Sequence, residues 1–253
     1  MKNNSVDFNK DVLPFQLGLL QKAENYQKWS LEAVNSFLGN RILEIGSGIG
    51  NMSRWLPLKE RLILSEINPD FFKYLESVLE KYFFNDKKAT LLEVGTDSNW
   101  KEKLLKENID TIVSFNVLEH IEKDKDFISD LLFILKNSKS NLPKRLITFV
   151  PAHQFAFGSI DLNYGHFRRY SHLDLKKIKE ELIPEAKFFC RYFNFTGLIG
   201  WTICGRIMNK KDIDKNSILF FEKLCPWIKS FDDFLHLKLK FPLGQSVFSV
   251  ITL

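Results

Sequence analysis

The sequence contains few cysteines, and their placement excludes several kinds of site. The three cysteines, Cys190, Cys204 and Cys225, are odd in number, far apart and surrounded by apolar residues. There is no CxxC pair and no cysteine–histidine spacing typical of a zinc site. A disulfide framework is also excluded by the odd, scattered set. We therefore expect reduced thiols in the core of an intracellular, cytoplasmic protein.

The sequence also lacks an apolar run long enough to cross a membrane. The most apolar late stretch, residues 193–208, is shorter than the roughly 20 residues that a spanning helix needs. It is interrupted by Asn194, Thr196, Thr202 and Arg206. We assign it to a buried or interfacial helix. The N-terminal MKNNSVDFNKD has no apolar centre, so we do not expect a secretory signal there.

Concentrated basic charge is absent as well. The formal net charge is +5, and the lysines are scattered in short runs such as Lys176-Lys177 and Lys210-Lys211. A dedicated nucleic-acid surface would gather more positive charge on one face, so we expect no nucleic-acid partner. The apolar and charged fractions are those of a globular protein. The 253 residues are therefore expected to form one domain, 1–253, with a large core.

What the sequence does contain is a turn of alternating glycines. Residues 41–50 read RILEIGSGIG, an aliphatic run followed by Gly46, Gly48 and Gly50. Apolar residues resume at helical spacing from Met52 onward. The pattern predicts a buried strand that turns sharply into a helix. Glycines at such a turn let a ligand approach the main chain, as in nucleotide-type pockets at the carboxyl end of a strand.

Strands and helices alternate along the rest of the chain. We predict strands over residues 41–46, 61–66, 89–94, 110–115, 145–150, 186–193 and 246–253. We predict helices over 14–38 (inside an N-terminal helical segment, 1–40), 70–84, within 118–137, and over 172–182. This alternation predicts an α/β fold, a doubly wound, seven-stranded and mostly parallel sheet with helices on both faces. Residues 194–245 are predicted to form a helical insert between the sixth and seventh strands.

Two further motifs follow predicted strands. Glu66 ends the second strand, at the distance where an acid accepts hydrogen bonds from ribose hydroxyls. The segment NVLEHI, residues 116–121, follows the fourth strand. A dinucleotide fingerprint would read GxGxxG, but residue 51 is Asn and the glycines recur at every second position. The pattern therefore disfavours an NAD-dependent oxidoreductase.

Read together, these motifs resemble class I S-adenosylmethionine-dependent methyltransferases. In that family ExGxGxG follows the first strand, an acid ends the second, an Asp follows the third and an NVLEH-type segment follows the fourth. The corresponding positions here are Glu44 to Gly50, Glu66, Asp97 and residues 116–121. The resemblance implies a Rossmann-like methyltransferase fold, S-adenosylmethionine as cofactor, S-adenosylhomocysteine as product, and no metal.

The resemblance also implies a role for each cofactor-site residue. Glycines of the turn pass the methionine and ribose parts, Glu66 holds the ribose hydroxyls, and a tyrosine before the first strand closes over the cofactor. Asp97 or Thr96 addresses the adenine. The implied cofactor-binding set is Tyr26, Glu44, Gly46, Gly48, Gly50, Glu66, Ile67, Thr96, Asp97, Ser98, Asn116 and Val117. Structural alternatives stay open for three residues: Gly50 as a packing glycine, Asp97 as a turn or N-cap residue, and His120 as a capping or packing residue.

The segment after the fifth strand concentrates titratable groups. It resembles a bacterial subgroup of these methyltransferases that shares PAxxxxxGSxD and GHxRRY, a late GW, here residues 200–201, and PxGQS, here residues 242–246. The acceptor of that subgroup is undefined. We expect His166 or His153 as a catalytic base, with Asp161 orienting it. The acceptor-binding candidates are Arg168, Arg169 and Tyr170. The alternative is that these side chains only brace the loop.

The insert is rich in aromatic residues. Its recurring large rings are Trp201, Phe220, Phe221, Trp227, Phe231 and Phe234. We expect either core packing or an apolar lid over a lipid-like or aromatic acceptor. The leading hypothesis is a methyltransferase acting on O or N of a small-molecule or lipid-linked acceptor, and contact with a membrane surface stays open. The alternative is a non-catalytic S-adenosylmethionine-binding subunit or regulator.

Overall fold

Seven strands form one sheet in the order β3-β2-β1-β4-β5-β7-β6. The computed structural model describes residues 15–83, 88–94 and 99–253. The strands are β1 Arg41–Ile45, β2 Arg61–Ser65, β3 Ala89–Leu92, β4 Thr111–Phe115, β5 Arg145–Pro151, β6 Lys187–Phe193 and β7 Ser246–Thr252. The first five are parallel, and β7 runs antiparallel between β5 and β6.

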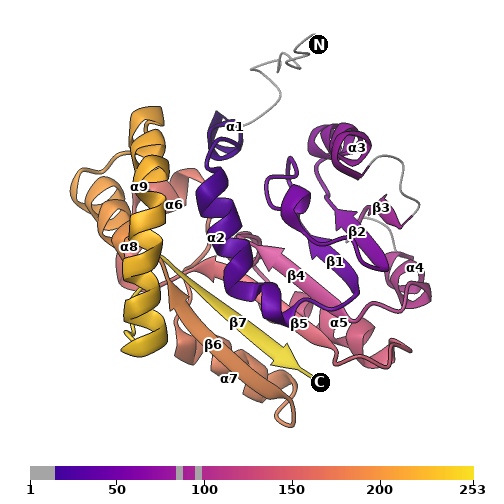
Figure 1. The fold of residues 1–253 in the computed structure, drawn as a ribbon. Coiled ribbons are helices and arrows are strands. Elements are labelled where there is room, and N and C mark those ends of the chain that lie inside the picture. Colours follow the sequence, from indigo (N-terminus) through magenta and orange to yellow (C-terminus); the bar gives the residue numbers. More distant parts are fainter. Residues whose placement is uncertain (1–14, 84–87, 95–98) are drawn as a thin grey trace.

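Helices cover both faces of this sheet (Figure 1). The α-helices are α1 Phe15–Leu20, α2 Glu24–Val34, α3 Pro69–Phe83, α4 Trp100–Lys106, α5 Asp124–Asn137, α6 Ser159–Asn163, α7 His172–Leu182, α8 Phe195–Thr202 and α9 Lys215–Asp233. Short 3₁₀ turns are η1 Asn35–Phe37, η2 Ser53–Trp55, η3 Leu118–His120 and η4 Gln154–Ala156, and π-helical turns are η5 Ile203–Ile207 and η6 Phe234–Lys238.

The apolar core is divided into two layers by the sheet. On one face α2, α3 and α9 pack on the strands, with Trp29, Leu75 and Cys225 among the buried contacts. On the other face α4, α5 and α7 supply the covering side chains, such as Leu104 and Leu135. The central strands β1, β2 and β4 are buried over nearly their whole length. Burial on both sides explains their continuous aliphatic sequences.

The order of the strands determines where a ligand site can lie. The direction of strand succession reverses between β1 and β4, which are neighbours in the sheet. In doubly wound folds, ligands bind in the crevice outside the carboxyl ends of the strands at such a switch point. The loops that follow β1, β4 and β5 therefore gather at one edge. They are the loops that carry the motifs described above.

The predicted fold class is confirmed, as are all seven predicted strands to within a few residues. The helix predicted to follow the glycine turn is wrong, because the chain forms only the turn η2 before entering β2. The face that such a helix would cover is occupied by α2, and Gln27 of α2 accepts hydrogen bonds from Arg54 and Trp55. The helix predicted over 14–38 is divided into α1, α2 and η1, and α4 was not predicted.

The insert is helical, as predicted, but its aromatic residues are not mainly buried. The rings of Phe220, Trp227, Phe231 and Phe234 are between 51% and 69% exposed. Helix α9 packs beside α2 through Phe221, Cys225 and Ile228, and its opposite side faces outward (Figure 1). The expectation that these rings were too apolar for the surface is therefore corrected. Within the described ranges, no helix has both the length and the apolarity needed to cross a membrane.

Candidate functional site

Each glycine of the β1 turn takes a left-handed conformation. The φ angles of Gly46, Gly48 and Gly50 are +66°, +56° and +80°. A Cβ on Gly46 would lie 2.5 Å from Val117 Cγ2, and one on Gly50 would lie 2.9 Å from Val78 Cγ1 of α3. A Cβ on Gly48 would meet no atom of the described residues within 4 Å. Gly46 and Gly50 therefore permit close packing, whereas Gly48 leaves its main chain open to a ligand.

Glu44 anchors this turn from inside the protein. Its side chain is buried and accepts hydrogen bonds from the hydroxyls of Ser47, at 2.8 Å, and Ser53. Burial raises the pKa of Glu44 to about 7, and the two serine hydrogen bonds oppose that rise. The contacts of Glu44 are with the turn itself, so its role in the described geometry is to hold the glycines in place.

Glu66 lies at the end of β2, beside the open glycine. Its Oε2 accepts from the amide of Gly48 at 2.8 Å, and its Oε1 accepts from the amides of Ile67 and Asn68, both at 2.8 Å. These three bonds fix the carboxylate against the turn. A carboxylate has about four acceptor positions, so among the described residues one acceptor position is left for a ligand hydroxyl. The side chain of Ile67 is 63% exposed next to it.

The segment after β4 completes this side of the crevice. Asn116 has a φ of +52°, and its amide donates to the carbonyl of Phe149 at 2.8 Å. Val117 packs against Gly46. The structure thus brings together Gly46, Gly48, Glu66, Asn116 and Val117. The predicted adenine-side residues Thr96, Asp97 and Ser98 lie outside the described residues.

Tyr26 lies in an aromatic cluster at the junction of α2, β6 and α9. Its ring centroid is 6.2 Å from that of Trp29, 6.0 Å from Phe193 and 5.9 Å from Phe221. Glu222 of α9 accepts a hydrogen bond from the backbone amide of Tyr26. The ring is therefore positioned by the insert as well as by its own helix. Its predicted closure over the cofactor remains a prediction.

Asp161, after β5, is the centre of a buried hydrogen-bond network. Its Oδ1 accepts from His166 Nδ1 at 2.9 Å and from Arg169 Nε at 2.7 Å. Its Oδ2 accepts from the amide of Gly158 and from Trp201 Nε1 of α8, both at 3.0 Å. Burial alone would raise the pKa of Asp161, but the hydrogen bond from His166 and the charge of Arg169 lower it to about 2. Asp161 is therefore a permanent anion that orients His166.

The three predicted acceptor-binding side chains are engaged with the protein itself. Arg169 is buried, donates from Nη1 to the carbonyl of Ala152 at 3.0 Å, and lies over the ring of Trp201. The Arg168 guanidinium and the Tyr170 hydroxyl both bind the Asp124 carboxylate, at 2.7 and 2.8 Å. These contacts are those of the brace alternative. Direct acceptor binding by these residues remains a prediction.

His153 contacts a different set of residues from those that His166 contacts. It has a φ of +64°, and its ring stacks on Tyr192 and Phe155 at centroid distances of 4.6 and 5.0 Å. The amide of Gly244 donates to His153 Nε2 at 3.4 Å. Burial lowers the pKa of His153, and the charge of Arg169 lowers it further. His153 thus ties the end of β5 to β6 and to the loop before β7.

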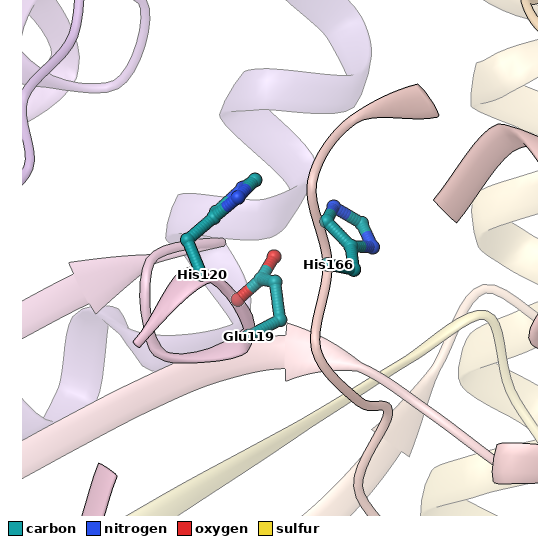
Figure 2. Close-up of side chains that lie close together, drawn as sticks. All are labelled: Glu119, His120 and His166. Atoms are coloured by element: carbon teal, nitrogen blue, oxygen red, sulfur yellow. The ribbon is translucent and has the colours of Figure 1, made fainter. Parts of the chain in front are cut away.

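One cluster was not foreseen from the sequence. Glu119, His120 and His166 come together, each with one ligand atom within 4.8 Å of the others (Figure 2). The rings of His120 and His166 are 4.7 Å apart at 82°. Sequence reasoning treated His120 as a capping or packing residue. Both segments follow adjacent parallel strands, but His166 comes after η4 and α6, so the strand order alone does not place it beside Glu119.

Similarity to known proteins is found in structure. No family model and no curated protein matches the chain. A SAM-dependent methyltransferase from Archaeoglobus fulgidus matches with 17% identity, a TM-score of 0.55 and coverage of 95% of this chain and 100% of that chain. One from Aquifex aeolicus matches with 10% identity, a TM-score of 0.50 and coverage of 94% and 96%.

A third structure was solved with a ligand. It is a phosphoethanolamine N-methyltransferase 2 of Haemonchus contortus in complex with S-adenosylmethionine, matching with 13% identity and a TM-score of 0.51 over 85% of this chain and 48% of that chain. The chain has the fold of S-adenosylmethionine-dependent methyltransferases. This confirms the fold that the sequence motifs implied. Within this methyltransferase fold, the glycine turn and Glu66 occupy the switch-point edge described above.

Proposed function

We propose that the chain is an S-adenosylmethionine-dependent methyltransferase that transfers a methyl group to O or N of a small-molecule or lipid-linked acceptor. One observation carries the proposal: Glu66 is hydrogen-bonded to the open glycine of the turn, at the switch-point edge of a methyltransferase-type sheet. An acid beside an accessible glycine main chain is what recognition of a ribose-bearing cofactor requires.

The proposed cofactor position follows from the difference between Gly48, which has free space beside it, and Gly46 and Gly50, which are packed against other residues. The free side of Gly48 leaves room for the ribose, and the remaining acceptor position of Glu66 receives a ribose hydroxyl. Asn116 and Val117 line the methionine part. Thr96, Asp97 and Ser98 are proposed for the adenine from the resemblance alone. Tyr26, held between α2 and α9, is proposed to cover the cofactor.

The proposed chemistry is an in-line displacement at the sulfonium methyl group. The leaving group is a neutral thioether, so alignment and exclusion of water account for most of the catalysis. An acceptor that arrives as an alcohol or ammonium must lose a proton. The Asp161–His166 pair, with its 2.9 Å hydrogen bond, is the proposed base, and Arg169 positions it through Asp161. His153 is the second candidate base.

The outward face of α9 supports a lipid-linked acceptor. Phe220, Trp227 and Phe231 recur at intervals that place them along one side of α9, and Phe234 follows at the start of η6. All four side chains are exposed. Exposed apolar stripes of this kind mark interaction sites, and aromatic rings are suited to a membrane interface. In a sedimentation assay with lipid vesicles, the wild-type protein should be found in the vesicle pellet. The double variant Trp227→Glu/Phe231→Glu should stay in the supernatant. Equal vesicle binding by both proteins would show that these two rings do not make the contact, and absence of binding by the wild type would argue for a water-soluble acceptor.

Calorimetry with S-adenosylhomocysteine tests the cofactor site. Replacing Glu66 by Gln keeps its shape but removes the charge that strengthens a hydrogen bond to a ribose hydroxyl. Charge-assisted bonds contribute about 1.5–3 kcal/mol, so we expect affinity to fall by roughly tenfold or more. The matched control is Glu76→Gln, on the exposed side of α3. Unchanged affinity in folded Glu66→Gln, or tighter binding of NAD than of S-adenosylhomocysteine, would contradict the proposal.

A screen of phenols, amines, sugars and polyprenyl-linked glycans is the route to the acceptor. Once a substrate is found, His166→Ala should lower turnover and leave the affinity for S-adenosylhomocysteine nearly intact, since His166 acts on the acceptor. Full turnover in this variant would remove His166 from the mechanism.

A further inference from the structure

Glu119 carries a carboxyl group that is buried without a hydrogen-bond partner among the described residues. Its side chain is 0% exposed, and within the described part of the chain no other residue donates a hydrogen bond to either of its oxygens. Leaving both oxygens of a buried carboxyl unpaired is costly. Such a group is expected to have a ligand.

Two imidazoles border the same carboxylate. Figure 2 shows the Glu119 carboxylate directed into the space between the rings of His120 and His166. One ligand atom from each of the three residues lies within 4.8 Å of the others. We propose that Glu119, His120 and His166 form a binding site for a divalent transition-metal cation.

One of the two histidines is already oriented in the way that metal ligands usually are. His166 uses Nδ1 to bind Asp161, which leaves Nε2 for a cation. Metal-bound histidines nearly always donate their second nitrogen to a carboxylate or a carbonyl in this manner.

Backbone contacts hold the two halves of the cluster together. Glu119 and His120 belong to η3, just after β4, and His166 belongs to the loop that follows α6. The amide of Phe167 donates to the carbonyl of Glu119 at 2.8 Å, and the amide of His166 donates to the carbonyl of Asp161 at 3.0 Å. Because β4 and β5 are paired neighbours, the fold itself brings the two halves of the cluster together.

The ligand set indicates the kind of cation. Two imidazoles and one carboxylate suit Zn²⁺, Co²⁺ or Fe²⁺, whereas Mg²⁺ and Ca²⁺ prefer oxygen ligands. Three protein ligands with an open fourth position are typical of catalytic zinc sites. The position is open here because His120 is exposed while Glu119 and the His166 side chain are buried. The cation would therefore meet solvent, or an acceptor, on one side only.

A consequence for the reaction rests on the proposed function. A cation at this site takes an acceptor hydroxyl as its fourth ligand and lowers the pKa of that hydroxyl. The hydroxyl proton passes to water, the oxygen forms the new bond to the methyl carbon, and the methyl–sulfur bond breaks to leave the neutral thioether. When the cation is bound, His166 Nε2 is a ligand, so water takes over the role of proton acceptor that was proposed above for His166 in the absence of a cation. The site thus favours methylation at oxygen.

The experiment uses the full-length chain after removal of metal by a chelator. Co²⁺ is titrated and followed by its visible absorption, and Zn²⁺ is titrated by calorimetry. We expect one equivalent to bind to the wild type. His120→Ala and Glu119→Gln should weaken affinity by at least about tenfold, the lower end of the loss seen even for outer-shell partners. The matched control, His172→Ala, removes a histidine outside the cluster and should bind like the wild type.

The outcomes separate this site from the proposed function. Absence of Zn²⁺ and Co²⁺ binding in the wild type, or equal binding in His120→Ala, would overturn the cation site. His120 is exposed, so its replacement is expected to fold even if Glu119→Gln does not. S-adenosylhomocysteine is titrated into the same samples. Cation binding without S-adenosylhomocysteine binding would retain the site and contradict the methyltransferase proposal, and the reverse result would do the opposite.

Discussion

The two sides of the sheet's carboxyl edge are built differently. Backbone groups line the edge near β1 and β2, whereas charged side chains gather near β4 and β5. The first side is built from three glycines with positive φ and a carboxylate that binds backbone amides. The second is built from Asp161, to which a histidine, an arginine and a tryptophan donate. One edge of one sheet therefore contains two sites of different construction.

The contrast shows how each side keeps its shape. A glycine turn depends on dihedral angles that other residues adopt only at a cost, so few substitutions are tolerated there. Its shape does not rely mainly on charged side chains. A buried ionic network depends on every partner being present, because an isolated buried charge is strongly unfavourable. Removing charge should therefore damage the β4–β5 side most, and adding a methyl group should damage the β1–β2 side most.

The largest effect is expected at Asp161. Replacing it by Asn leaves the buried guanidinium of Arg169 without its counter-ion, and breaking a buried pair costs about 3–5 kcal/mol. Urea unfolding should show this loss of stability. Asp126→Asn, exposed in the first turn of α5, is the control and should change stability little. A loss below about 1 kcal/mol at Asp161 would mean that the network does not stabilise the fold.

The next effect separates two glycines of the same turn. Gly46→Ala combines the cost of a positive φ, about 1–2 kcal/mol, with a clash against Val117, for a total of about 2–4 kcal/mol. The methyl group of Gly48→Ala meets no atom in the described part of the chain, so this change should cost only about 1–2 kcal/mol. It should nevertheless weaken S-adenosylhomocysteine binding, because its methyl group enters the ligand space. Thermal unfolding and calorimetry on both variants would test this, and equal stability losses would contradict the assigned packing.

The last effect depends on pH and is near zero at pH 4. The pKa of Glu44 is raised to about 7 from 4.5, so between these values the folded protein retains a proton that the unfolded chain has lost. Stability should therefore fall as pH rises through this window. Glu44→Gln removes the titration, and its advantage over the wild type should grow from near zero at pH 4 to at most about 3 kcal/mol at pH 8. A difference that is the same at both pH values would show that Glu44 does not titrate in this range.

The same contrast explains what the sequence could predict. The glycine turn, Glu66 and the strand ends depend on local spacing, so they were predicted together with the parallel sheet. The Glu119–His120–His166 cluster requires knowing that the loop around Gly165 folds back onto η3, which periodicity does not reveal. The helix expected after Gly50 failed for a similar reason. Its place on the sheet is taken by α2, which lies earlier in the sequence.

The insert shows a further limit. Its apolar positions predicted a helix, and α9 exists, but an apolar stripe does not reveal whether it meets a core or the surroundings. Phe221 and Cys225 face α2 and the sheet, while Trp227 and Phe231 face outward. The sequence alone presented all of them as equivalent. The structure separates the buried positions from the exposed ones, because only one side of α9 packs against α2 and the sheet.

The position of β7 between β5 and β6 has a consequence for synthesis on the ribosome. While β5 and β6 emerge, each has an edge that only β7 will cover, and β7 follows the whole insert in sequence. Until then the nascent chain carries open strand edges next to the apolar side chains of α8 and α9. Open edges favour pairing with other chains. Production of the protein in a host should therefore respond to chaperones that protect such intermediates during translation, and a chain interrupted before Ser246 should be directed to aggregates or proteolysis.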